Sequence, residues 1–487
     1  MQEGLALTQR ATLSLQLPIR SLFDGFFDNV VSGRGFVADP LIGQHEGTLM
    51  TIASGSNPLR SLAIVGLLFF IIGFFTWING PLITFVQLAF DLDEVNAFLV
   101  LMVFYLSYFF LALPAAALLK RTGMKKGLAI SLFVMAVGAA MFGEFSTQRW
   151  YPGALSGLFV IGGGLALLQT AVNPYVSILG PIESAARRIA LMGICNKIAG
   201  MLAPIVIGTL VLHGVGDLAA QVEAADAAGK AVLLGAFAAK IHLPYLVMAG
   251  ILVMVAIGIL FSPLPEVKPA EANAAPVDDA ADGERGLAQF PHLWLGVLCL
   301  FVYVGVEVLA GDAIGTYGRG FGLPLDQTKL FTTYTLFAML AGYLVGLAAI
   351  PRFVSQERYL AISATLGVLF ALGALLTHGY VSVGFVAALG FANAMMWPAI
   401  FPLAIKGLGR HTETGSALLI MGIAGGAILP QAFAVLKQHY DFQAVFAGLA
   451  VPGYLYILYY ALAGHRVGRS RPATDVPERG IMADSPP

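Results

Sequence analysis

The sequence predicts an all-α membrane protein in which twelve transmembrane helices form two pseudo-symmetric halves of six. Hydrophobic residues make up 58% of the 487 positions and charged residues only 11%, which is too little charge for a soluble chain of this length. Twelve apolar stretches, most of them near the roughly 20 residues that cross a bilayer as a helix, fall into two blocks of six. A polar segment over about 265–290 separates the blocks. Each stretch is expected to be helical, because only a helix satisfies the backbone of a single segment in lipid.

The expected helices follow one another in order. In the first block they cover 62–85, 97–119, 127–142, 152–179, 189–212 and 243–261. In the second block they cover 293–310, 330–350, 359–376, 381–405, 417–436 and 445–462, and the third and ninth of the twelve are short. The chain thereby divides into an N-terminal cytoplasmic segment (1–59), a first half (60–263), a cytoplasmic linker (264–291), a second half (292–464) and a cytoplasmic tail (465–487).

Lysine and arginine gather in the loops on one side of the expected bundle. Those loops and the tail hold Lys120, Arg121, Lys125, Lys126, Arg187, Arg188, Arg352, Arg358, Lys406, Arg410, Arg466, Arg469, Arg471 and Arg479. The opposite loops hold only Arg149, Lys230, Lys240, Arg319, Lys329 and Lys437. Positively charged loops stay in the cytoplasm, so both termini are expected there.

The remaining global features narrow the function little further. Residues 1–49 lack the apolar core of a signal peptide, and two interpretations stay open: a true start at Met50, or a disordered cytoplasmic extension. Cys195 and Cys299 fall inside expected helices, where buried thiols are inert, so no disulfide framework is expected. The net charge of −1 and the absence of a basic run give no reason to expect a nucleic-acid partner.

Local repeats support two homologous halves. Gln169 in the fourth expected helix and Asn393 in the tenth each precede a proline by five residues. The triplet Met-Gly-Ile occurs in the fifth helix at 192–194 and in the eleventh at 421–423. Such repeats, related as two parallel halves, place a substrate site near the middle of the bilayer between the halves.

Polar side chains inside the expected helices are candidates for that site. Gln169 and Asn173 lie four residues apart and so share a helix face. Their amides can bond sugar hydroxyls, or alternatively bond neighbouring helices. Asn79 follows Trp77 next to a Gly-Pro pair that weakens the first helix, and Trp77 could stack on a pyranose ring or serve as packing. Three further residues, Asn393, Trp397 and Asn196, complete the expected substrate-binding set.

Glu307 is the most isolated charge in the expected helices, within an apolar run. Placing a carboxylate inside a membrane costs free energy, so a carboxylate within a transmembrane helix often belongs to a proton or ion path. Asp312 follows near the end of the same helix, and Lys197 is the one basic residue well inside a helix. Lys197 could pair with Glu307 or extend its amine to the cytoplasmic surface. Glu307, Asp312 and Lys197 are the expected cation-coupling residues, and no metal or catalytic site is expected.

Several of these residues stand in longer runs that resemble one family. The runs cover 76–80, 168–175, 180–186, 192–197 and 303–308. Together they resemble the fucose–galactose–glucose symporter family of the major facilitator superfamily over roughly residues 60–465, and its bacterial glucose/galactose transporter branch most closely. The resemblance implies the major facilitator fold and uptake of a monosaccharide across the bacterial inner membrane, by alternating access and coupled to H⁺ or Na⁺. Glucose or galactose is the implied sugar, with N-acetylglucosamine or fucose as alternatives. A monomer without a cofactor is expected.

The sequence departs from the fucose branch of this family at two positions. That branch has an acidic residue after the first-helix asparagine and another in the fourth helix, where this chain has Gly80 and Gln169. Glu307 is therefore the expected substitute in coupling. Two other functions fit the sequence less well than sugar transport. A drug or metabolite exporter would have a more apolar cavity, and a membrane enzyme would need catalytic groups in an outer loop. The long outer loop at about 213–240 is alanine-rich and holds no such group, so the protein is not expected to be an enzyme.

Overall fold

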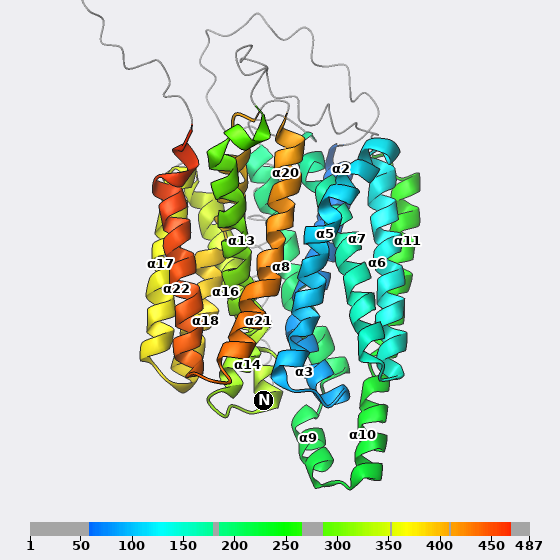
Figure 1. Cartoon of the computed structure of the whole chain (residues 1–487). Helices are drawn as coiled ribbons and strands as arrows, with labels where there is room; N and C mark the ends of the chain where they lie inside the picture. The colour runs from blue at the N-terminus through cyan, green and yellow to red at the C-terminus, as the bar shows by residue number, and fades with distance from the viewer. Residues whose placement is uncertain (1–57, 179–184, 265–285, 351–352, 409–410, 469–487) are drawn as a thin grey trace, which may run out of the picture.

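The computed structural model describes residues 58–178, 185–264, 286–350, 353–408 and 411–468 (Figure 1). Most of the predicted N-terminal segment, linker and tail lie outside these ranges, as does Met50. The described part forms a bundle of long helices that run roughly parallel to one axis. Twelve of its helical spans are long and apolar enough to cross a membrane, which confirms the predicted fold class.

The described residues of the first half form ten helices. They are α2 (Pro58–Trp77), α3 (Asn79–Ala89), α4 (Glu94–Ala97), α5 (Leu99–Thr122), α6 (Met124–Thr147), α7 (Tyr151–Ile178), α8 (Ala185–Leu210), α9 (Val215–Ala224), α10 (Ala227–Ala239) and α11 (His242–Phe261). Six spans result, because α2 continues into α3, α4 into α5 and α10 into α11.

The second half repeats this plan. Its helices are α13 (Pro291–Gly311), α14 (Ile314–Arg319), α15 (Leu325–Thr328), α16 (Phe331–Ala349), α17 (Gln356–Leu376), α18 (Gly379–Asn393), α19 (Met396–Ile405), α20 (Thr412–Met421), α21 (Gly425–Leu436) and α22 (Phe442–Leu462). Short 3₁₀ turns lie at Leu287–Gln289, Gly422–Ala424 and Gly464–Arg466.

Two parts of the prediction need correction. The third and ninth helices are longer than expected: α6 has 24 residues and α17 has 21, since both continue into their polar flanks. The expected outer loop at 213–240 is largely helical and forms the α9–α10 hairpin, which extends beyond the other helices at the lower end of Figure 1. Alanine is the strongest helix former, and Asp226 caps α10 by accepting from the Gly229 N–H.

Three spans are interrupted near the middle of the bundle. Between α2 and α3 the break is a single residue, Ile78, whose N–H still donates to the Phe74 carbonyl at 3.1 Å. The tenth span turns between α18 and α19, and the eleventh passes from α20 to α21 through a 3₁₀ turn. Gly425 lies at the end of that turn, where a Cβ would overlap the Phe301 carbonyl of α13. Interrupted helices at this depth are typical of transporter binding sites.

Polar contacts between the halves gather at one end of the bundle, the lower end in Figure 1. We call it the Glu94 end. The Glu94 carboxylate of α4 forms ion pairs with Lys437 at 2.5 Å and Arg319 at 3.6 Å, both from the second half. Nearby, Lys329 donates to the Leu212 carbonyl at 2.8 Å. The halves are therefore tied together across this end.

Candidate functional site

A cavity lies in the middle of the bundle, where both halves meet. Its empty space is about 830 Å³, including the part open to solvent. Helices α2, α5, α7 and α8 line it from the first half, and α13, α16, α19 and the 3₁₀ turn before α21 line it from the second. Seven residues of the predicted site contribute to its walls: Trp77, Gln169, Asn173, Asn196, Lys197, Glu307 and Trp397.

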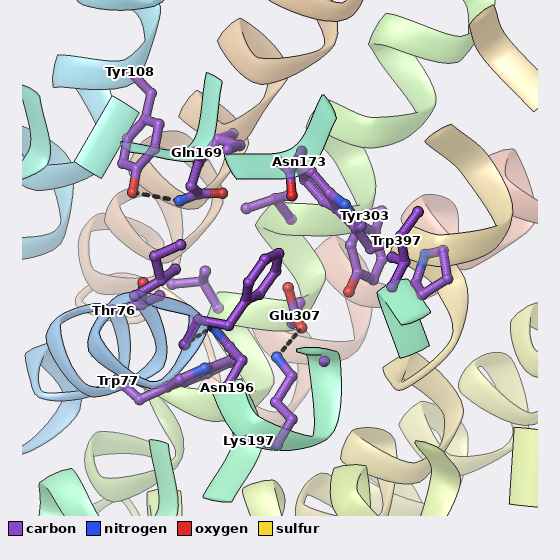
Figure 2. A pocket seen from close by; sticks show the side chains of 18 of the residues that line it. Thr76, Trp77, Tyr108, Gln169, Asn173, Asn196, Lys197, Tyr303, Glu307 and Trp397 are labelled. Carbon is purple, nitrogen blue, oxygen red and sulfur yellow. Dashed lines mark hydrogen bonds and ion pairs between the residues drawn. The ribbon is translucent and has the colours of Figure 1, made fainter. Parts of the chain in front are cut away.

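An ion pair crosses the cavity between the halves. Lys197 Nζ of α8 lies 3.2 Å from Glu307 Oε1 of α13 (Figure 2). The two side chains are only 7% and 11% exposed, so each charge depends on the other for compensation. The Lys197 amine also lies 4.6 Å from the centre of the Trp77 ring, a favourable position over the negative face of an aromatic ring. Of the two alternatives for Lys197, the pairing with Glu307 is the one the structure contains.

Carboxamides form the wall contributed by the first half. Gln169 donates from Nε2 to the Tyr108 hydroxyl at 2.9 Å, which fixes the orientation of the amide and leaves its oxygen at the cavity (Figure 2). Asn173 lies one turn further along α7 and also lines the cavity, as its spacing from Gln169 predicts. Asn196 of α8 donates weakly to the Phe69 carbonyl at 3.4 Å. These groups offer a ligand both hydrogen-bond donors and acceptors.

Aromatic rings form two further parts of the wall. Trp77 is buried at the end of α2, and its ring packs against Gly200 of α8 and Gly311 of α13. Trp397 stands on α19 in the opposite half and stacks on Phe401, with ring centres 5.9 Å apart and planes inclined by 22°. An apolar ring face beside fixed amides is suited to a ligand that has both C–H faces and hydroxyl groups.

Three predicted residues do not line the cavity. Asn79 at the start of α3 is buried and donates to the Thr76 carbonyl of α2 at 3.0 Å, within the same span. Asn393 is buried where α18 ends, and its Oδ1 accepts from the Tyr454 hydroxyl at 2.9 Å. Asp312 is buried behind the cavity, 3.5 Å from the Tyr105 hydroxyl. The equal spacing of Gln169 and Asn393 before a proline therefore does not give them equal positions in this conformation.

The structure adds cavity residues that the sequence prediction left out. Thr76, Tyr343 and Ile423 line the cavity, and Tyr303 places its hydroxyl beside the Glu307 carboxylate. Tyr303 had a signal in the sequence, since it precedes Glu307 by four residues on one helix face. Tyr343 had none, because a tyrosine in an apolar helix has no feature that separates a cavity residue from a packed one.

Comparisons with known proteins show which proteins this chain resembles. The family model described as Major Facilitator Superfamily matches residues 65–430. A glucose/galactose transporter of Brucella abortus (biovar 1, strain 9-941) is 33% identical over 420 residues, which cover 85% of this chain and 96% of that protein. The L-fucose-proton symporter of Escherichia coli K12 is 29% identical over 372 residues, covering 73% of this chain and 83% of that protein.

A solved structure shares the fold as well. It is a major facilitator transporter, FucP, in the outward conformation, with 26% identity and a TM-score of 0.66 over 83% of this chain and 98% of that one. A D-xylose-proton symporter has the same fold at 13% identity and a TM-score of 0.58.

Proposed function

The chain belongs to the fucose–galactose–glucose symporter family of the major facilitator superfamily, and on this premise we propose that it imports a monosaccharide by cation symport. The observation that carries the proposal is the cavity between the halves, with fixed amides and a tryptophan on one side and a buried ion pair across it. Glucose or galactose is the proposed sugar, by likeness to the transporter of Brucella abortus.

Sugar recognition is assigned to cavity residues of both halves. Gln169, Asn173 and Asn196 would bond hydroxyl groups of the sugar, and Trp77 and Trp397 would contact its apolar face. A site built from hydrogen-bonding groups is selective, because a ligand without the matching hydroxyl leaves buried polar atoms unpaired. This polarity supports a sugar over the apolar substrates of a drug exporter.

Coupling is assigned to the charges between the halves. The Lys197–Glu307 pair joins α8 to α13 only while these helices lie close together, so it favours the conformation in which they meet. The coupling ion is proposed to be H⁺, by likeness to the L-fucose-proton symporter, with Na⁺ as the alternative. No cofactor is part of the proposal.

The proposed setting is the bacterial inner membrane, with both termini in the cytoplasm. Twelve apolar spans support a multi-pass membrane protein, and the excess of lysine and arginine in alternate loops supports the orientation. In this orientation the Glu94 end faces outward. Ties between the halves at that end would belong to a conformation closed to the outside, which differs from the outward conformation of the related FucP structure. A monomer is proposed, since one chain contains the whole cavity.

Uptake by the purified protein in proteoliposomes tests this function. Labelled glucose and galactose are supplied while a pH gradient and a Na⁺ gradient are imposed separately, with unlabelled N-acetylglucosamine and fucose as competitors. We expect saturable uptake of glucose or galactose that one of the gradients drives above equilibrium. Labelled N-acetylglucosamine and fucose are then supplied in the same way, and absence of saturable uptake for all four sugars would refute the proposal. Transport of apolar drugs in place of sugars would instead favour the exporter.

A further inference from the structure

Asp312 is a second buried carboxylate between the halves, and its setting differs from that of Glu307. It lies directly after α13 and is only 2% exposed. Among the described residues, no cationic side chain forms an ion pair with it, whereas Glu307 has Lys197 at 3.2 Å. An ionised carboxylate buried without a counter-ion is strongly unfavourable, and such a group becomes neutral by taking up a proton.

The neighbours of Asp312 come from both halves of the protein. In the first half, Tyr105 of α5 lies with its hydroxyl 3.5 Å from Oδ2, and the Gly80 backbone of α3 packs beside Oδ1. In the second half, Thr332 of α16 donates to the Gly311 carbonyl at 2.8 Å and so holds the end of α13 in place. The carboxyl group is thus enclosed only while α3 and α5 meet α13 and α16.

The titratable and charged groups that act on Asp312 are few. They are Tyr105 from α5, Lys197 from α8 and Glu307 from α13. Lys197 is engaged by Glu307 and by the Trp77 ring. Tyr105 lines the cavity as well as contacting Asp312, so it connects the carboxyl group with the space proposed for the sugar.

We infer that Asp312 carries the transported proton, while the Lys197–Glu307 pair stays ionised. With the Glu94 end open, the Asp312 carboxylate takes up a proton from water outside, and the neutral carboxyl group can then be enclosed as the halves close. After closure the proton leaves to water in the cavity beside Tyr105, and the uncompensated carboxylate that remains favours reopening of the Glu94 end. The direct neighbours of Asp312 favour H⁺ over Na⁺, because a metal ion needs several converging lone pairs and, of the described side chains, Tyr105 alone is hydrogen-bonded to the carboxyl group.

This inference rests on the proposed sugar transport, and the test separates the two. Proteoliposomes with wild type, Asp312→Asn and the control Asp91→Asn are given a pH gradient of one unit. Asp91 is an exposed acid at the Glu94 end, paired with Lys230 in its own half. For one proton per sugar, wild type and Asp91→Asn accumulate sugar up to about tenfold, because a tenfold concentration ratio balances one pH unit. Asp312→Asn should lose this accumulation and the sugar-induced uptake of protons, yet still exchange labelled for unlabelled sugar.

Each outcome decides something. If wild type takes up no sugar, the proposed function is refuted, and so is the inference that rests on it. If Asp312→Asn accumulates sugar as wild type does, or if only a Na⁺ gradient drives wild type, the inference fails while sugar transport stands. If Asp312→Asn loses exchange as well, Tyr105→Phe decides. Removing the hydroxyl beside Asp312 should shift the pH at which sugar affinity changes, and an unchanged pH profile would overturn the inference.

Discussion

Replacing Glu94 with glutamine should open the Glu94 end of the bundle. The carboxylate compensates two cations of the other half, Lys437 at 2.5 Å and Arg319 at 3.6 Å. Glutamine has nearly the same shape but no charge. These ion pairs exist only while the halves meet at this end, so their loss destabilises the closed conformation and leaves the open one unaffected. The equilibrium between the two conformations therefore moves toward the open one.

The size of this shift follows from the burial of the three side chains. The Glu94 side chain is 25% exposed, that of Lys437 13% and that of Arg319 15%. The free energy that these partly buried ion pairs contribute should therefore lie between the values measured for exposed and for fully buried pairs. Exposed pairs contribute about 0.2–1 kcal/mol, and removal of one partner from a fully buried pair costs about 3–5 kcal/mol. Burial lowers the pKa of Arg319 and Glu94 acts in the opposite direction, so the cation is partly desolvated and depends on the carboxylate. A loss of about 2 kcal/mol corresponds to a roughly thirtyfold change in the equilibrium.

Distances between spin labels at the Glu94 end measure that equilibrium. Cysteines placed at two exposed positions, Ala228 in the first half and His439 in the second, carry the labels after Cys195 and Cys299 have been replaced. We expect Glu94→Gln to enlarge the population with the longer distance.

The matched control for this measurement is Glu144→Gln. Glu144 is an acid at the same end, and the His242 ring beside its carboxylate, at 3.7 Å, lies in the same half. The control should leave the distance distribution as in wild type. The reasoning is refuted if Glu94→Gln also leaves it unchanged, or if both variants shift it equally.

Three further substitutions test the cavity. Gln169→Ala should weaken sugar binding by roughly tenfold or more, because leaving a buried hydrogen-bond partner unpaired costs about 1–3 kcal/mol. Calorimetry on the folded variant measures this, and an unaltered sugar affinity would contradict it. Asn393→Ala, by contrast, should reduce stability by about 1–3 kcal/mol through the Tyr454 hydroxyl it leaves unpaired, with sugar affinity kept, and a tenfold loss of affinity would restore Asn393 to the binding site. Glu307→Gln should reduce stability and sugar binding, because it leaves the buried Lys197 charge without a counter-ion. Adding Lys197→Met to this variant should restore part of both. A double variant no more stable than Glu307→Gln would argue against the importance of the pair.

The twelve helices could be predicted from the sequence because lipid imposes a strict rule. Every segment that crosses the membrane must be apolar and must satisfy its own backbone, so composition alone identifies it. The site was predicted less completely. Gln169, Asn173 and Glu307 stand out as polar groups in apolar helices, and all three line the cavity. Asn393 stands out equally but bonds Tyr454, since the sequence does not tell which face of a helix looks toward the cavity.

Gly80 shows what the sequence alone could not reveal about the acidic positions. The resemblance indicates that this chain lacks the first-helix acid of the fucose branch, and from sequence the natural substitute was Glu307. In the structure a Cβ at Gly80 would lie 3.1 Å from Asp312 Oδ1. A carboxyl group thus occupies the space next to the first helix, although it is supplied by the other half of the chain. Contacts between segments more than two hundred residues apart leave no local pattern from which to predict them.

One segment of the second half supplies three acidic or basic groups that meet the first half. From the middle of the bundle toward the Glu94 end, Glu307 pairs with Lys197, Asp312 lies by Tyr105, and Arg319 pairs with Glu94. The partners come from three different helices of the first half: α8, α5 and α4. Separation of the halves at the Glu94 end must therefore expose Arg319 and Asp312 to water before it reaches Glu307. Because an exposed carboxylate is stable without a counter-ion and an enclosed one is not, this order lets the proton bind at Asp312 before the cavity closes.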